Sequence, residues 1–165
     1  MQSRRVFVAR APVRVDFTGG LIDAPPFSAD FPGRAVNAAI SLHTYAEGYL
    51  RDDKTIRLVS EDTGAIVEAD SVEDLHLDGR LDLVKGVAKR LLGNFGIEIR
   101  TRSDAPPGGS RLGASGALGV SLVALIDALL GTKMKRNEIA QVAASVEREI
   151  GIACLLYTSP SPRDR

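Results

Sequence analysis

The sequence predicts one domain that mixes β-strands with α-helices, because two kinds of hydrophobic spacing occur along it. Apolar residues recur at every second position near the N-terminus and again over 95–99, as in strands with one buried face. Over 81–92 and 138–150 they recur every three or four positions, which is typical of amphipathic helices. The length of 165 residues suits one ordinary domain.

The composition excludes several classes of protein. Lys plus Arg and Asp plus Glu both number 21, so no net positive charge favours a nucleic acid or membrane partner. The longest apolar stretch, 118–130, contains a serine and an aspartate and is too short to span a bilayer. The single cysteine, Cys154, rules out a disulfide framework and fits a reducing compartment. We therefore expect a cytoplasmic protein with neither nucleic acid nor membrane as its partner.

The N-terminal half is expected to be rich in strands. Strands are predicted over 6–8 and 13–17, and Pro12 between them indicates a strand edge or a break. A long loop is predicted over 21–33, which contains three prolines, and 35–42 resumes as a strand. Residues 45–50 and 55–59 flank a four-residue polar turn and are predicted to pair as a hairpin, with a further strand over 65–69.

The C-terminal half is expected to alternate helices with a strand. The helix over 81–92 is predicted to end at Gly93, because glycine suits the left-handed conformation that closes many helices. A strand over 95–99 follows. The segment 117–130 is apolar nearly all round, which predicts a helix buried on most of its surface and ended by Gly131. A last helix over 138–150 is expected to have Asn137 as its N-cap.

A glycine-rich stretch joins the 95–99 strand to the helix that follows it. Residues 103–118 read S-D-A-P-P-G-G-S-R-L-G-A-S-G-A-L. Glycines let backbone N–H groups approach an anion closely, and the following helix adds the positive end of its dipole. We infer a phosphate-binding loop for ATP, with Ser115 in the first helical turn able to reach a phosphate-bound Mg²⁺. The alternative is a plain strand-to-helix turn whose glycines serve tight packing.

The nucleotide-binding residues predicted in this loop are Pro107, Gly108, Gly109, Ser110, Arg111, Leu112, Gly113, Ala114 and Ser115. Two common phosphate-binding motifs do not fit them. A P-loop requires a lysine after its second glycine, and Ala114 occupies that position. The dinucleotide motif G-x-G-x-x-G fails as well, because S-R-L follows the first two glycines.

Three motifs in order resemble the GHMP kinase superfamily of small-molecule kinases. The family's glycine-rich motif has the form P-x-x-x-G-L-G-S-S-A, and 107–116 match its spacing, with Arg111 replacing a usual glycine and Ala114 the first serine. The segment 11–23 is similar to the N-terminal motif, in which an acid follows an arginine by nine residues, here Asp23 after Arg14. The third match is Glu147 followed by an arginine, and the run 19–27 is most similar to the heptose-phosphate kinase and fucokinase branch.

The resemblance implies the α+β fold of the ribosomal protein S5 domain 2-like class, as the N-terminal ATP-binding domain of a sugar kinase over 1–152. It implies ATP and Mg²⁺ as cofactors and a sugar or sugar phosphate as substrate. Asp23 would bind sugar hydroxyls, and Arg14, the catalytic candidate, would orient the reacting end or stabilise charge. Ser115 and Glu147 would hold Mg²⁺. Helical spacing by itself does not distinguish Glu147 from Glu149.

Residues 153–165 depart from this pattern. They contain two Ser-Pro steps and no periodicity, and they are similar to the translated adapter sequence that ends some gene fragments, so a disordered, aberrant tail is expected. The family's next segment, which carries the aspartate expected to act as base, and its C-terminal domain are both expected to be missing. We therefore expect the fragment itself to be inactive. The alternative function is a non-catalytic nucleotide- or small-molecule-binding module, with Arg111 and Ala114 as signs of a degenerate motif.

Overall fold

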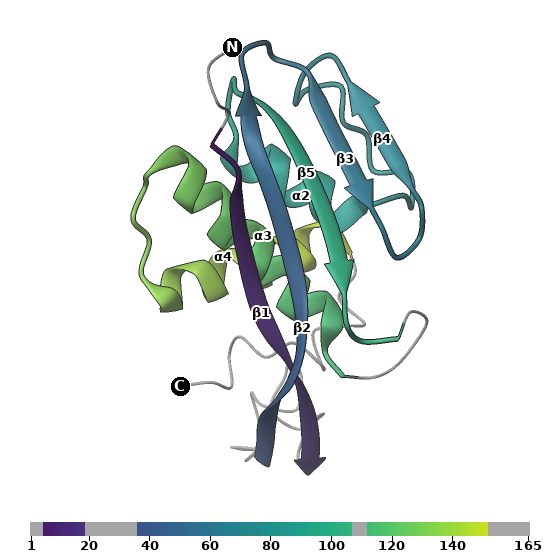
Figure 1. Cartoon of the computed structure of the whole chain (residues 1–165), viewed down its shortest axis with the longest axis vertical. Coiled ribbons are helices and arrows are strands. Elements are labelled where there is room, and N and C mark those ends of the chain that lie inside the picture. Colours follow the sequence, from purple (N-terminus) through teal and green to yellow (C-terminus); the bar gives the residue numbers. More distant parts are fainter. Residues whose placement is uncertain (1–4, 19–35, 107–111, 152–165) are drawn as a thin grey trace.

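The computed structural model describes residues 5–18, 36–106 and 112–151 (Figure 1). In this part of the chain, five strands form one mixed sheet and three helices lie against one of its faces. The strands are β1 (Phe7–Thr18), β2 (Val36–Arg51), β3 (Ile56–Ser60), β4 (Ile66–Ala69) and β5 (Gly96–Ser103). The helices are α2 (Asp82–Leu91), α3 (Ala114–Leu130) and α4 (Arg136–Glu149). None of these helices is long and apolar enough to cross a membrane.

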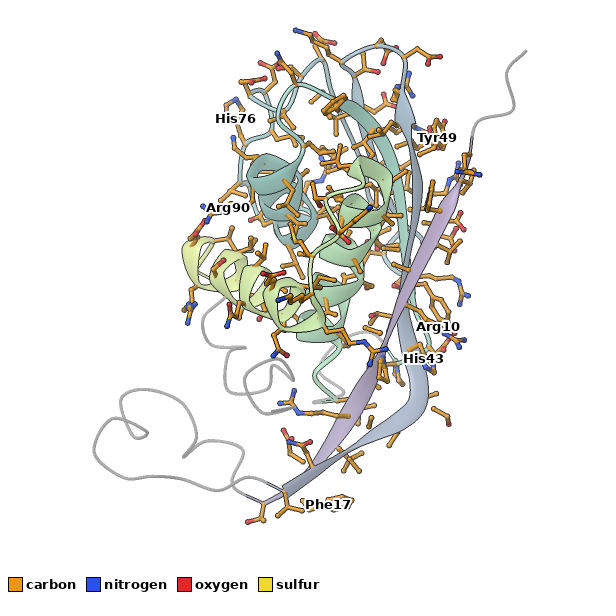
Figure 2. All side chains as sticks on the ribbon, turned by 90° about the vertical axis from the view of Figure 1, so that its left-hand side faces the viewer. Arg10, Phe17, His43, Tyr49, His76 and Arg90 are labelled. Carbon is orange, nitrogen blue, oxygen red and sulfur yellow. The ribbon has the colours of Figure 1, made fainter. Side chains whose placement is uncertain are left out.

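The sheet has the strand order β1-β2-β5-β3-β4. β5 pairs antiparallel with β2 and parallel with β3, while the outer pairs β1–β2 and β3–β4 are antiparallel. In the view turned by 90°, the helices all lie to one side of the sheet (Figure 2). Alternate residues of a strand face opposite sides of a sheet, so Ile97 and Ile99 join the core beneath the helices, whereas Glu98 lies on the face without helices.

The predicted hairpin between 45–50 and 55–59 is wrong. Those segments fall in β2 and β3, and β5 lies between them: Ile97 is opposite Leu50 on one side and Ile56 on the other. The short connection between β2 and β3 therefore crosses the start of β5. A Cβ on Gly96 would lie 2.8 Å from the Thr55 carbonyl oxygen and closer still to that of Asp53, so only glycine fits beneath the crossing.

Pro12 lies within one continuous strand at the edge of the sheet. Of the two predicted alternatives, the strand edge is correct and the break is wrong. β1 is an outer strand of the sheet and pairs only with β2. An outer strand tolerates a residue that lacks an N–H. The β1–β2 register shifts between Pro12 and Arg14, an irregularity that turns the following part of the strand.

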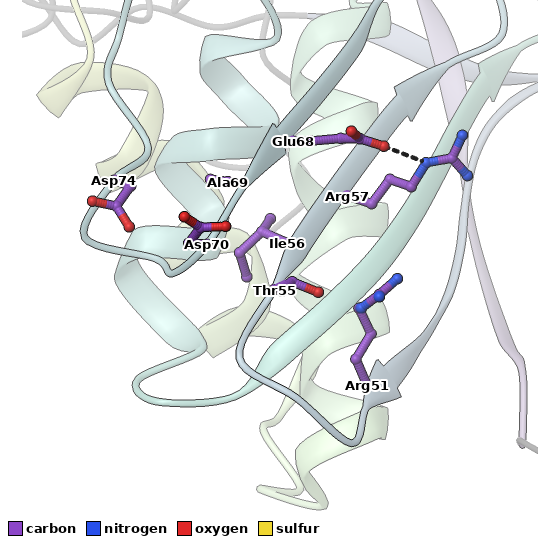
Figure 3. Close-up of a pocket in the computed structure, with 8 residues that line it drawn as sticks. All are labelled: Arg51, Thr55, Ile56, Arg57, Glu68, Ala69, Asp70 and Asp74. Atoms are coloured by element: carbon purple, nitrogen blue, oxygen red, sulfur yellow. Dashed lines mark hydrogen bonds and ion pairs between the residues drawn. The ribbon is translucent and has the colours of Figure 1, made fainter.

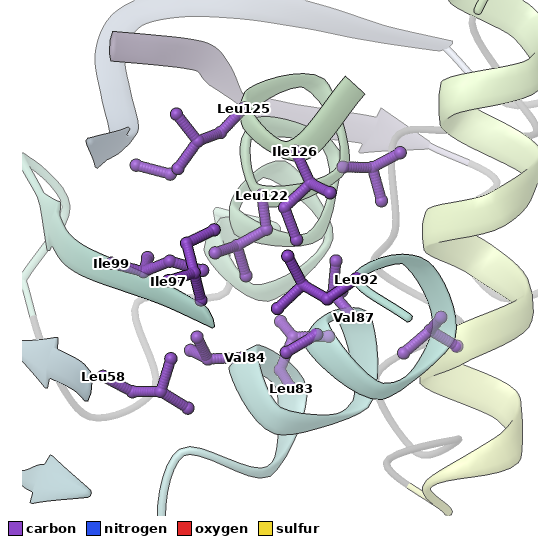
Figure 4. Packing of buried hydrophobic residues seen from close by; sticks show 14 of the residues in the cluster. Leu58, Leu83, Val84, Val87, Leu92, Ile97, Ile99, Leu122, Leu125 and Ile126 are labelled. Carbon is purple, nitrogen blue, oxygen red and sulfur yellow. The ribbon is translucent and has the colours of Figure 1, made fainter. Parts of the chain in front are cut away.

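The core lies between the sheet and the helices. Figure 4 shows side chains of β3 and β5 meeting side chains of α2 and α3. The labelled members are Leu58, Leu83, Val84, Val87, Leu92, Ile97, Ile99, Leu122, Leu125 and Ile126, and all are buried. α3 packs against β1, β2, α2 and α4, which agrees with its apolar character on nearly every side.

The helices are followed by glycines in the expected left-handed conformation, but the start of α4 differs from the prediction. Gly93, Gly131 and Gly151 all have positive φ, at 56°, 69° and 73°, beyond the ends of their helices. α4 begins at Arg136, so Asn137 lies inside the helix and is not its N-cap. The N-cap is Lys135, and its backbone N–H donates to the Glu138 carboxylate at 2.6 Å. A carboxylate in the first turn thus reaches back to the N–H of the N-cap residue, as the acidic residue of a capping box does.

Candidate functional site

The glycine-rich loop ends at the start of α3, and the structure describes this junction from Leu112 onward. Gly113 has φ 67° and ψ 27°, a left-handed conformation that glycine adopts without the usual steric cost. It is the N-cap of α3, and no side chain among the described residues caps the helix there. The first turn can therefore offer backbone N–H groups and the positive end of the helix dipole to a ligand.

Ser115 and Glu147 come together at this end of α3, although 32 positions separate them in sequence. The Ser115 hydroxyl donates to Glu147 Oε1 at 2.9 Å. Glu147 is 1% exposed, on the face of α4 that packs against α3. The two residues predicted to hold Mg²⁺ thus form one cluster of oxygen atoms beside the glycine-rich loop.

Burial distinguishes the two carboxylates that helical spacing left equivalent. The side chain of Glu149 is 55% exposed and lies 3.8 Å from the Arg90 guanidinium, on the outer side of α2 and α4. Glu147, two residues earlier, points into the α3–α4 interface. Residues two apart on a helix are about 200° apart around its axis, so only one of the pair can face α3.

Arg14 lies beneath the same loop. Its backbone N–H donates to the carbonyl oxygen of Leu112 at 2.9 Å, which joins β1 to the last part of the loop. Its side chain is almost fully buried, and the guanidinium makes two bonds to Asp16, Nε to Oδ1 at 2.7 Å and Nη2 to Oδ2 at 3.2 Å. The remaining nitrogen, Nη1, is buried and has no hydrogen-bond partner in the described part of the chain.

Asp16 is the residue of this site that the sequence analysis missed. A visible signal existed, because positions i and i+2 of a strand lie on the same face, and an arginine and an aspartate stand at those positions of β1. Bidentate pairing fixes the orientation of a guanidinium and also balances its positive charge. Asp16 therefore orients Arg14.

A cavity of about 580 Å³ adjoins the start of α3. Ala114, Ser115 and Leu118 form its wall on α3, and residues 101–103, 105 and 106, at and beyond the end of β5, form a second wall. A third wall is the turn before α2, with Gly79, Leu81 and Asp82. The volume is in the range that holds a small organic ligand.

The charges near the end of β5 are held in fixed pairs. The Arg102 guanidinium lies 3.6 Å from the centre of the Tyr45 ring and 3.4 Å from the Asp104 carboxylate. The His43 backbone N–H, and then the Tyr45 hydroxyl and Arg102, hold the pKa of Asp104 below its ordinary value against the opposing effect of burial. Asp104 is therefore ionised at neutral pH.

A second hollow, of about 490 Å³, lies beside β3 and β4 and shares no residue with the cavity at α3 (Figure 3). Both of its arginines are paired with carboxylates: Arg57 binds Glu68 at 3.0 Å, and Arg51 binds Asp53 at 3.0 Å. Such paired surface charges are typical of a solvated sheet edge.

The remaining predicted site residues lie outside the described part of the chain. They are Asp23, Pro107, Gly108, Gly109, Ser110 and Arg111. The other predicted site residues are described, and they lie together at the start of α3. They are Arg14, residues 112–115 and Glu147.

A model of the family described as the GHMP kinases N terminal domain matches residues 82–155. This segment of the chain belongs to the GHMP kinases. The matched segment includes α2, β5, α3 and α4, and hence Ser115 and Glu147, while Arg14 precedes it.

Two curated relatives are of the predicted branch of GHMP kinases. One is the D-glycero-alpha-D-manno-heptose 7-phosphate kinase of Campylobacter jejuni, 32% identical over 145 residues, which are 85% of this chain and 42% of the relative. The other is the L-fucokinase/L-fucose-1-P guanylyltransferase of Bacteroides fragilis, 29% identical over 88% of this chain and 18% of the relative. The chain thus spans less than half the length of these relatives.

The same fold occurs in a solved GHMP kinase of this branch. The D-glycero-D-manno-heptose 1-phosphate kinase of Bacteroides thetaiotaomicron superposes with a TM-score of 0.80 at 27% identity, over 88% of this chain and 48% of that one. The predicted N-terminal-domain fold and the similarity to heptose-phosphate kinases and fucokinases are confirmed.

Proposed function

We propose that this chain is the nucleotide-binding part of an ATP- and Mg²⁺-dependent kinase that phosphorylates a sugar or a sugar phosphate. The observation that carries the proposal is the contact of Ser115 with the buried Glu147 at the uncapped start of α3. The relatives' names support the substrate class, since they specify a heptose phosphate and fucose.

The donor set suits Mg²⁺. This ion prefers oxygen ligands and is commonly held by one or two carboxylates together with phosphate oxygens and water. A hydroxyl and a carboxylate 2.9 Å apart, beside a loop proposed to hold phosphates, provide the protein's share of such a site. When bound, the ion would neutralise negative charge on the β- and γ-phosphates during transfer.

The roles of the other residues follow from their positions or, for Asp23 and 107–111, from the resemblance to the family. Residues 107–115 would hold the phosphates, and the adjoining cavity of about 580 Å³ would take the nucleoside. Arg14, oriented by Asp16, would direct its buried Nη1 to negative charge at the reacting end. Asp23 would bind sugar hydroxyls.

We further propose that the kinase domain covers 1–152, with 153–165 as a separate tail, and that the protein acts in the cytoplasm. The balance of 21 basic and 21 acidic residues supports a small-molecule ligand over nucleic acid or an anionic membrane. The single cysteine supports a reducing compartment.

Isothermal titration of the chain with ATP, with and without Mg²⁺, tests the proposal. We expect Mg²⁺ to strengthen ATP binding in the wild type. Ser115→Ala and Glu147→Gln should each lower the affinity for Mg²⁺-ATP by about 10- to 100-fold, as removal of groups in or beside a metal site commonly does. Neither change should greatly alter the affinity for ATP without the metal.

Glu149→Gln is the matched control. It makes the same chemical change on the same helix, but at an exposed carboxylate that pairs with Arg90. We expect wild-type affinity for Mg²⁺-ATP in this variant. ATP binding that ignores Mg²⁺, or an equal loss in Glu147→Gln and Glu149→Gln, would contradict the proposed metal site and favour a non-catalytic binding module.

A further inference from the structure

A buried lysine on α2 is not explained by the proposed site. The side chain of Lys85 is only 2% exposed, in a helix whose neighbouring residues form the core. Its Nζ donates to the His76 carbonyl oxygen at 2.8 Å and to the Asp78 carboxylate, and it lies 3.6 Å from the carboxylate of Asp82. Burying an ammonium is costly unless such partners surround it.

Two of the partners of Lys85, Asp78 and Asp82, fix the backbone of one turn, residues 78–81. The Asp82 carboxylate accepts the backbone N–H groups of Asp78 at 3.2 Å and Gly79 at 2.9 Å. The Asp78 carboxylate in turn accepts the backbone N–H of Arg80 at 3.0 Å. The Lys85 ammonium, followed by the Arg80 N–H, holds the pKa of Asp78 below its ordinary value, so Asp78 keeps its negative charge at neutral pH.

The same turn contains strained backbone. Leu81 has φ 54°, a left-handed conformation that is unfavourable for a leucine, and Gly79 has φ 87°. A conformation of this kind persists only where the surroundings over-determine it. Here the surroundings are Lys85 and the two carboxylates to which it is joined.

The turn is a wall of the cavity that begins at Ser115. Gly79, Leu81 and Asp82 line it, together with Ala114 and Ser115 at the proposed phosphate end. We propose that Lys85 is a positioning residue for the nucleoside: by holding the 78–81 turn rigid, it sets the wall against which the base of the bound nucleotide packs. This inference rests on the proposed function, and it adds the part of the nucleotide that the turn would recognise.

The physical reason is pre-organisation. A wall that is already ordered loses little conformational entropy when a ligand packs on it. The apolar side chains of Leu81 and Leu118 line the same cavity and provide surface for a planar base. The phosphates would bind to the loop and α3, whereas the Lys85 ammonium bonds to His76 and Asp78 before α2, so a change at Lys85 should affect the nucleoside and spare the phosphates.

The experiment compares two probes by calorimetry in the presence of Mg²⁺: ATP, and inorganic tripolyphosphate, which lacks the nucleoside. We expect Lys85→Met to weaken ATP binding by about tenfold or more while changing the affinity for tripolyphosphate by less than about twofold. Lys89→Met is the matched control. Lys89 lies one turn later on α2, and its Nζ donates to the Leu75 carbonyl oxygen at 2.7 Å and not to the 78–81 turn, so both affinities should stay at wild-type values.

Gly79→Ala provides a second variant in case Lys85→Met does not fold. Apart from the residues next to it in the chain, no described atom lies within 4 Å of the added Cβ, so the methyl group meets no clash within the protein and disturbs the turn through the φ of 87°, which alanine disfavours. We expect the same selective loss of ATP affinity.

An equal loss of ATP and tripolyphosphate binding in these variants would overturn the inference, because it would mean that Lys85 only stabilises the domain. Unchanged ATP affinity in both variants would also overturn it. A wild-type chain that binds neither probe would instead contradict the proposed function itself.

Discussion

Two arginine–aspartate pairs in this chain share one geometry and differ in burial. In each, an arginine on a strand binds an aspartate two residues later through Nε and Nη2: Arg14 with Asp16, and Arg51 with Asp53. The Arg14 side chain is 3% exposed and that of Arg51 is 25% exposed. A buried guanidinium depends on its partner because water cannot replace it.

We therefore expect Arg14→Lys to lower the free energy of unfolding by about 2–4 kcal/mol, since lysine keeps the charge but cannot form both bonds. Arg51→Lys, the same change in the exposed pair, should cost less than about 1 kcal/mol. Urea denaturation of both variants measures the difference. Equal losses would show that burial does not decide the strength of these pairs.

At the scale of elements, the decisive feature is the crossing of the β2–β3 connection over the start of β5. The connection passes directly above Gly96, and the Ile97 N–H donates to the Thr55 carbonyl oxygen at 3.1 Å. This crossing lets β5 lie between two strands that follow each other in sequence. Any side chain at position 96 would push the connection away from the sheet.

Gly96→Ala should accordingly destabilise the chain by about 2–3 kcal/mol, because backbone atoms must move to admit one methyl group. Gly119→Ala is the control: in α3 the added Cβ would meet Ala143 Cβ at 3.5 Å, an ordinary contact. There, the better helix propensity of alanine should stabilise the chain by up to about 1 kcal/mol. Thermal and urea unfolding would measure both changes, and a harmless Gly96→Ala would be inconsistent with the crossing.

At the scale of the whole molecule, one carboxylate joins the three central strands on the face without helices. Glu98 of β5 accepts bonds from the Tyr49 hydroxyl of β2 at 2.8 Å and from Arg57 of β3 at 3.3 Å, and Arg100 lies at 3.3 Å. Burial by itself would raise the pKa of Glu98, but the hydrogen bonds of Tyr49 and Arg100 and the positive charges outweigh it and lower the pKa.

A carboxylate with a lowered pKa in the folded state stabilises the fold above its pKa in the unfolded chain, about 4.3, and loses this contribution as the pH falls through the folded value. We expect Glu98→Gln to reduce the free energy of unfolding at neutral pH, and the difference from wild type to shrink below about pH 4. Urea denaturation across pH 3–7 measures it. Glu68→Gln, an exposed partner of the same Arg57, should show a much smaller difference, and a pH-independent effect of Glu98→Gln would contradict the assignment.

Local spacing within the sequence was enough to determine the helices and the family. The 3.6-residue period predicted α2 and the continuous apolar run predicted α3, and the glycines at 93 and 131 predicted where they end, because helix formation depends on residues only a few positions apart. The resemblance of the glycine-rich motif, of the segment 11–23 and of Glu147 with its following arginine predicted a GHMP kinase, and the family comparison agrees.

Only the tertiary structure decided the strand order, the partner of Arg14 and which of the two helical carboxylates is buried. The sequences of β2 and β3 are typical of a hairpin, but strand pairing depends on which strands the whole fold places side by side. Here β5 lies between β2 and β3 and pairs with both. In the same way, the sequence does not show which of the two carboxylates faces α3. The structure shows that Glu147 does and that Glu149 is exposed. Burial and long-range pairing are set by contacts between distant segments, and no local pattern contains them.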